Sequence, residues 1–332
     1  MNEKALSTMH DYPESKDFIF TIFDDTDVAT LDYIMPIYDL LSSLNIRTTK
    51  SVWPLKCNDK SPYEGSHTLE DPAYADYIRE LAGRGFEIGF HGPTMTSSGR
   101  ENIQRSLEVF HNVVGHYPRI YAPHSLNREN LYWGSSRFTF APLGTIYSIL
   151  SKEDREFYQG HIEGSPFFWG DLSLQFIDYV RSFTFNNVNL LNISRMLPYH
   201  NSRLPWVKSF FFTSDADNVE EFNLFLSEEN QSKLEQQRGV CIISTHFGKG
   251  FLRNGRVHPR TKELLSRLAE KNGWFVPVST ALDFLKSRSA TTEMGAGHLF
   301  SLELRWFVHA MIRQKNAREY DRTEKDYLFR RR

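Results

Sequence analysis

Polar side chains that can bind a metal or move a proton follow four short apolar segments of this chain. Asp24 and Asp25 end the run FIFTIF in the acidic cluster DDTD, and His91 ends FEIGF. His124 follows IYAP, and His246 follows CIIST. Taken alone, each has a structural interpretation, since an acidic pair at such a place often caps a helix. Four such positions in chain order favour a functional cluster.

Carboxylates and imidazoles are the groups that the hydrolysis of an amide requires. The reaction needs an activated water, a base for its proton, stabilisation of the oxyanion and an acid for the leaving nitrogen. A divalent metal held by two histidines and one carboxylate, with open positions, can activate the water and polarise the carbonyl. A second carboxylate beside the metal can act as the base, and a histidine across the cleft as the acid.

The apolar segments that carry these residues alternate with segments of helical periodicity. Buried strands are expected at residues 18–23, 48–55, 86–91, 120–123, 239–245 and 274–279, and helices at 31–44, 73–82, 102–114, 219–237 and 261–271. This alternation predicts a parallel sheet or barrel, in which functional residues gather where strands end in loops. Residues 134–206, rich in aromatics, prolines and asparagines, yield only scattered strands.

The segments FTIFDDTD, EIGFH, PRIYAPHS and IISTHFGKGF resemble, in this order, the motifs of the NodB-homology polysaccharide deacetylases, carbohydrate esterase family 4. The resemblance covers residues 18–286 and implies a distorted (β/α) barrel. It also implies a metal-dependent hydrolase that removes an N-acetyl group from a sugar. On this resemblance Asp24 is the general base, Asp25 and His91 bind the metal, expected to be Zn²⁺, and His246 is the general acid.

The sequence departs from that family in two motifs. Met95 stands where a second histidine is usual, and methionine is a poor ligand for such an ion. Ala122 stands at the position of the arginine that pairs with the catalytic aspartate. We infer that His124 replaces the missing ligand and that Arg128 takes the arginine role, with Arg119 as the second candidate.

Composition excludes several classes of protein. The formal net charge of −2 gives no basic field for nucleic acid. Two cysteines outside any Cys-x-x-Cys pair form no disulfide framework. The polar start lacks the apolar core of a signal peptide, and no run reaches the roughly 18 apolar residues of a membrane span. We therefore expect a cytoplasmic protein with a carbohydrate substrate, nucleotide- or lipid-linked, in surface-polysaccharide synthesis.

Three regions are expected along the chain: a polar segment at residues 1–17, the deacetylase-like barrel at 18–286, and a linker with a helical extension at 287–332. Apolar residues within 299–312 follow the i, i+4, i+7, i+8 pattern of an amphipathic helix. Such a helix packs on the barrel or on a dimer partner, or lies on a membrane surface. The sequence leaves the oligomeric state open.

Two other functions fit the same residues. One is a metal-dependent hydrolase of a small amide or cyclic imide, since its barrel and metal would look alike. The other is a non-catalytic glycan-binding relative that has lost its metal. Met95 and Ala122 favour this last alternative, whereas the presence of Asp24, Asp25 and His246 argues against it.

Overall fold

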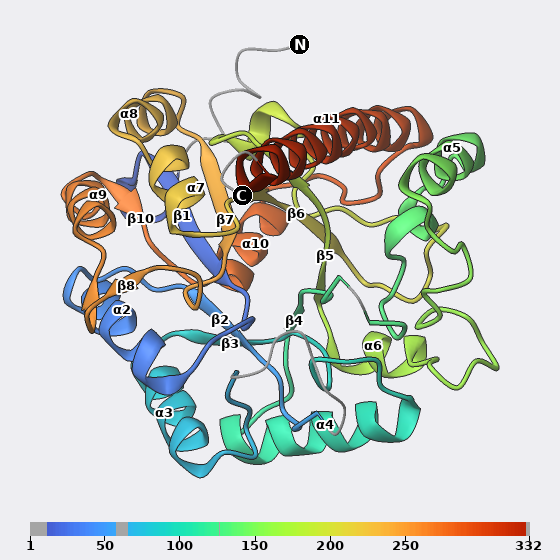
Figure 1. Ribbon diagram of the computed structural model, residues 1–332, viewed down its shortest axis with the longest axis horizontal. Helices are drawn as coiled ribbons and strands as arrows, with labels where there is room; N and C mark the ends of the chain where they lie inside the picture. The colour runs from blue at the N-terminus through green and yellow to red at the C-terminus, as the bar shows by residue number, and fades with distance from the viewer. Residues whose placement is uncertain (1–11, 58–65, 126, 330–332) are drawn as a thin grey trace.

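Seven parallel strands close into a barrel (Figure 1). The computed structural model describes residues 12–57, 66–125 and 127–329, with side chains as far as Arg313 in the last helix. The strands are β1 (Phe18–Asp24), β2 (Thr49–Val52), β3 (Glu87–Phe90), β4 (Ile120–Tyr121), β5 (Tyr179–Phe185), β6 (Phe210–Asp215) and β7 (Val240–Thr245). β7 pairs with β1 from Ile19 and Val240 onward, which closes the ring. The predicted (β/α) barrel is thus confirmed.

β1 is the central strand of this arrangement. All seven of its residues are buried, as expected for a parallel strand covered on both faces. It pairs with β2 and β7 and also with the short strand β10 (Gly273–Trp274), which lies alongside its beginning. Because all the barrel strands are parallel, their carboxyl ends open at one end of the barrel, and the polar strand-end residues gather there.

Helices surround the barrel (Figure 1). They are α2 (Leu31–Ser43), α3 (Pro72–Gly83), α4 (Arg100–Val114), α5 (Ala141–Ser151), α6 (Gly170–Phe176), α7 (Val219–Phe225), α8 (Glu228–Gln236), α9 (Pro259–Ala269), α10 (Val278–Ser287) and α11 (Ala296–Phe329). In α4 the apolar residues Ile103, Leu107 and Phe110 are buried, one stripe of an amphipathic helix. Gly115 ends this helix with a φ of 89°, a conformation that glycine adopts at little cost.

The structure differs from the sequence-based expectation in three places. The region at 134–206 contains α5, α6 and β5, and β6 follows it; polar residues interrupt the apolar pattern of both strands. The single helix expected at 219–237 is two helices, because Ser227 caps α8 by accepting a hydrogen bond from the N–H of Asn230. The strand expected at WFVPVS ends at Trp274, and α10 begins after Pro277.

The C-terminal helix α11 packs on α5 and β5 and crosses one side of the barrel (Figure 1). On the buried face of α11 lie its own residues Leu299, Leu302 and Trp306. Its other face leaves apolar side chains exposed at Phe300, Leu304, Val308 and Ile312.

In the described part of the chain, no helix has the length and apolar character needed to cross a membrane. Of the polar segment expected at 1–17, residues 1–11 lie outside the described residues.

Candidate active site

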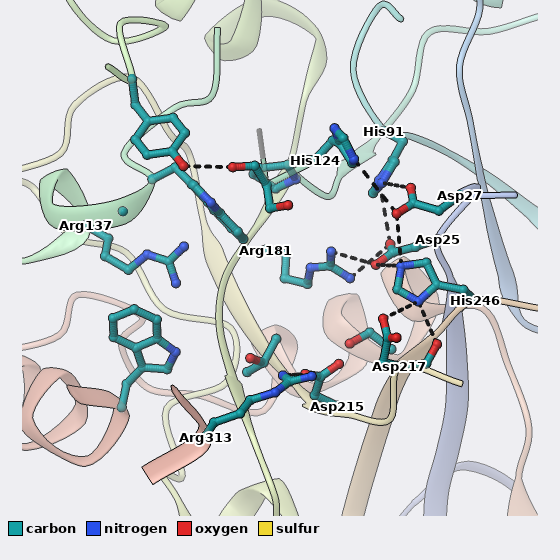
Figure 2. Close-up of a pocket in the computed structure, with 18 of the residues that line it drawn as sticks. Asp25, Asp27, His91, His124, Arg137, Arg181, Asp215, Asp217, His246 and Arg313 are labelled. Carbon is teal, nitrogen blue, oxygen red and sulfur yellow. Dashed lines mark hydrogen bonds and ion pairs between the residues drawn. The ribbon is translucent and has the colours of Figure 1, made fainter. Parts of the chain in front are cut away.

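A cavity of about 430 Å³ lies at the carboxyl ends of the barrel strands (Figure 2). Residues at or after the ends of β1, β3, β4, β6 and β7 line it, together with side chains from β5 and α11. Four of the six site residues expected from the sequence line this pocket, namely Asp25, His91, His124 and His246. Two do not, namely Asp24 and Arg128.

Asp25 is held by an arginine that the sequence analysis did not select. Arg181, on β5, donates from its two terminal nitrogens to the two carboxylate oxygens, at 3.0 and 2.8 Å. Such paired hydrogen bonds fix the plane of a carboxylate. Burial raises the pKa of Asp25, but the positive charge of Arg181, helped by His91 and His246, more than offsets this, so the pKa lies below its usual value.

Asp27 lies among three imidazoles. Its Oδ1 is 3.3 Å from Nε2 of His91, and its Oδ2 is 3.4 Å from Nε2 of His246 and 3.8 Å from Nε2 of His124. Burial raises the pKa of Asp27, whereas hydrogen bonds from His246 and His91 lower it by more, leaving it well below its usual value. Figure 2 shows this carboxylate facing the ring of His91. Asp27 belongs to the acidic cluster noted in the sequence, but it was given no role there.

His246 is fixed by a carboxylate on the side away from Asp27. Its Nδ1 is 2.9 Å from the backbone oxygen of Asp217 and 3.2 Å from the Asp217 Oδ1. The Nε2 points toward Asp27 and Asp25, at 3.4 and 3.8 Å. Burial lowers the pKa of His246, and the hydrogen bond with Asp27 and the charge of Asp25 raise it by more, so its pKa lies above the usual value. Lys249 pairs with the same Asp217 at 2.9 Å.

His124 is oriented by an amide. Its Nδ1 is 3.0 Å from Oδ1 of Asn127, and the Asn127 side-chain nitrogen donates to Glu129 and to the carbonyl oxygen of Thr94. With its oxygen therefore facing the histidine, Asn127 accepts a hydrogen bond from Nδ1–H. Burial and the nearby His91 lower the pKa of His124. The neutral ring then presents the Nε2 lone pair toward Asp27.

The donor set of Asp27, His91 and His124 fits a divalent metal ion. Two acceptors, the Nε2 lone pair of His124 and the Asp27 carboxylate, face each other, an arrangement that a cation between them stabilises. In a tetrahedral shell with bonds of about 2.1 Å, neighbouring ligands are about 3.4 Å apart, similar to the separations found here. Within the described residues, no three His, Cys, Asp or Glu side chains are already arranged as a metal site.

Asp24 lies beneath the pocket. Its carboxylate forms an ion pair with Lys50 at 3.0 Å and accepts hydrogen bonds from the Tyr38 hydroxyl and the Phe247 N–H, both at 2.9 Å. Successive side chains at a strand end point to opposite faces, so Asp24 points toward Tyr38 on α2, whereas Asp25 points into the cavity. Asp24, expected to be the general base, therefore lies outside the residues that line the cavity.

Arg128 and Arg119 also lie away from the cavity. The Arg128 guanidinium stacks over the ring of Phe167, 4.6 Å from its centre. Arg119 pairs with Asp178 and Asp283 on the outer surface.

Two residues of the site, Arg181 and Asp217, were missed because β5 and β6 were not assigned. Each nevertheless left a signal in the sequence. Arg181 is the charged residue of the otherwise uncharged run YVRSFTF, and Asp217 follows FFFTSD at a strand end.

Comparison with solved structures gives distant similarities. The chain is similar to a protein from Mycobacterium smegmatis assigned as a polysaccharide deacetylase, with a TM-score of 0.49, 12% identity, and coverage of 86% of this chain and 96% of that one. The PuuE allantoinase has a TM-score of 0.46 and 11% identity, with coverage of 84% of this chain and 93% of that one. A polysaccharide deacetylase from Bacillus cereus has a TM-score of 0.36 and 11% identity, with coverage of 79% of this chain and 92% of that one. No protein-family model matches the chain, and no curated protein matches its sequence significantly. Polysaccharide deacetylases are thus among the structures to which the chain is distantly similar.

Proposed function

We propose that this protein is a metal-dependent hydrolase that removes an acyl group, most simply N-acetyl, from a sugar. The observation that carries the proposal is the bidentate pair of Asp25 and Arg181 beside the Asp27, His91 and His124 donors. The family that the sequence resembles pairs its catalytic aspartate with an arginine. The roles therefore move along the acidic cluster: Asp25 is the base, and Asp27 is the metal-binding carboxylate.

Asp27, His91 and His124 would hold the ion, which we expect to be Zn²⁺ because nitrogen and carboxylate ligands suit it. When bound, a divalent ion lowers the pKa of a bound water and polarises the substrate carbonyl. Asn127 and Glu129 support this set from behind His124, in the manner of partners that orient ligand histidines.

Asp25 would take the proton of the attacking water. Arg181 favours the ionised carboxylate and holds its plane, so a lone pair is available near neutral pH. His246 would donate a proton to the leaving nitrogen through Nε2–H, because its Nδ1 is engaged by Asp217. The His246 Nε2 lies 3.8 Å from the Asp25 carboxylate, so both groups would act on the same tetrahedral intermediate, Asp25 on the attacking water and His246 on the leaving nitrogen.

The shape and lining of the cavity support a carbohydrate substrate. Trp133, Tyr147, Tyr158 and Trp306 line the pocket around the polar groups, and its volume of about 430 Å³ lies in the range of small-molecule sites. We expect the acyl sugar to be nucleotide- or lipid-linked and to serve surface-polysaccharide synthesis. A small amide or cyclic imide would use the same reacting groups and remains the second candidate.

Acetate release separates these candidates. The purified chain, loaded with Zn²⁺, is incubated with N-acetylhexosamines in free, 1-phosphorylated and nucleotide-linked form, and with hydantoin as a cyclic amide. We expect acetate from at least one sugar, loss of activity with a chelator and recovery with Zn²⁺. Opening of hydantoin without acetate release from any sugar would favour the imide hydrolase. A chain that binds Zn²⁺ but turns over neither class would contradict the proposal.

A further inference from the structure

Arg137 is a buried cation in the wall of the same cavity. It ends the short 3-10 helix η3 (Gly134–Arg137), and only 6% of its surface is exposed. Its guanidinium lies between two indole rings, 3.9 Å from the centre of Trp133 and 4.3 Å from that of Trp306. Figure 2 shows it pointing toward the middle of the pocket from the side across from His246 and Asp217.

Among the described residues, no carboxylate pairs with this guanidinium, and its Nε has no hydrogen-bond acceptor. The other cations that line the pocket are paired: Arg181 with Asp25, Lys249 with Asp217, and Arg313 with Asp215. A guanidinium stays charged at any working pH. Burying such a charge without a counter-charge is unfavourable, and stacking on aromatic faces offsets this only in part.

Glu153 is the candidate for an internal partner, because the other carboxylates that line the pocket pair with other side chains. It lines the same cavity, but it accepts a hydrogen bond from the Ser135 N–H at 2.6 Å. It also packs so closely on Gly134 that a Cβ there would meet its carboxylate oxygens. The first residues of η3 therefore hold Glu153, and the terminal nitrogens of Arg137 are left to the cavity.

We propose that Arg137 binds an anionic group of the substrate, a phosphate or a carboxylate carried by the acylated sugar. This rests on the proposed function and narrows it to a negatively charged sugar. A guanidinium offers N–H donors in a planar fork that matches two oxygens of either group. The two indoles hold the guanidinium in place, so little side-chain conformational entropy is lost on binding. Because Trp306 belongs to α11, the C-terminal helix forms part of this anion subsite.

Calorimetry on the full-length chain tests the inference with three probes: N-acetylglucosamine 1-phosphate, N-acetylglucosamine and glucuronate. We expect at least one charged probe to bind about 10-fold or more tightly than the neutral sugar, the effect of one charge-assisted pair. Binding of the phosphate alone identifies a phosphorylated sugar, and binding of glucuronate alone identifies a uronic acid. Equal or undetectable binding of all three would overturn the inference.

Matched variants locate the site. Arg137→Met keeps much of the packing between the indoles and should bring the charged probe to the affinity of the neutral sugar, whereas Arg137→Lys should lose part of the preference. The control is Arg128→Met, which removes an arginine that also stacks on aromatic rings but lies outside the pocket. Thermal unfolding without ligand verifies that each variant is folded. An Arg137→Met protein that binds the charged probe as tightly as the original chain would overturn the assignment.

The binding measurement is independent of turnover, so the two proposals fail separately. Deacetylation of neutral and charged sugars with equal kcat/KM would overturn the anion subsite and leave the hydrolase. Binding of a charged probe through Arg137, with no acyl sugar hydrolysed, would support the subsite and contradict the hydrolase.

Discussion

Lys50 and Asp24 form an ion pair with no solvent exposure, 3.0 Å from Nζ to Oδ2. Lys50 lies on β2 and Asp24 at the end of β1, and the two are register partners in the sheet. The pair therefore joins two barrel strands directly beneath Asp25. Because the pair lies in the packed interior, away from the cavity, it contributes to the stability of the fold.

The first prediction concerns this pair. Asp24→Asn leaves the Lys50 charge without its partner, and breaking a buried pair in this way typically costs about 3–5 kcal/mol. Urea unfolding should show a loss of that order in the free energy of unfolding. Asp24→Asn combined with Lys50→Met should regain much of it, because no buried charge is left over. If the single variant is as stable as the original chain but inactive, Asp24 has a catalytic role after all.

Asp25→Asn tests the assignment of the base. It removes the base and keeps the shape, so we expect kcat to fall about 10²–10⁴-fold while metal content stays the same. Asp27→Asn is the matched comparison: it should lower metal content, because it removes the carboxylate that faces His91, His124 and His246. Elemental analysis together with acetate release distinguishes the two. Near-normal kcat in Asp25→Asn would reject it as the base.

His246 is tested by changing the leaving group. His246→Ala should lower kcat for an N-acetyl sugar by about 10²-fold or more, the range for loss of a general acid. An aryl acetate ester needs little protonation of its leaving group and should be affected much less. Both substrates are measured on the same variant. Equal losses would mean that His246 positions the substrate or the metal and does not act as the acid.

Glu87, at the start of β3, gives the barrel a pH-dependent stability. Burial raises its pKa to about 7, although hydrogen bonds from Thr49 and the Ser279 N–H oppose this shift. Between its unfolded pKa, near 4.3, and about 7, the folded chain keeps a proton that the unfolded chain releases. Stability should therefore fall as pH rises through this window, by about 4 kcal/mol in all.

Glu87→Gln tests that prediction, because the amide has no proton to lose. Chemical unfolding at pH 5, 6, 7 and 8 should show a flatter profile than in the original chain, with the greatest relative gain at pH 8. Glu101→Gln, on the exposed surface of α4, should leave the profile unchanged. A profile in Glu87→Gln as steep as the original would assign the pH dependence to another group.

The strand-end rule located His91, His124 and His246 from the sequence, because parallel strands bring their carboxyl ends together whatever the details of packing. It could not choose between Asp24 and Asp25. That choice depends on which of two consecutive side chains faces the cavity, and thus on the position of β1 relative to α2. Arg181 was missed for a different reason: its strand mixes polar and apolar residues, so the apolar pattern that identifies a strand is broken at the functional residue itself.

Trp306 and Arg313 bring a second part of the chain, the helix α11, into the wall of the pocket. The groups assigned to the reaction belong to barrel strands and the loops that follow them, whereas this part of the wall comes from a helix beyond residue 295. Substitutions in that helix can alter which sugar is accepted while leaving the hydrolytic groups in place. A chain shortened after α10 would keep those groups but lose one wall of the cleft. Selectivity can therefore be engineered, by exchange of this tail, separately from the catalyst.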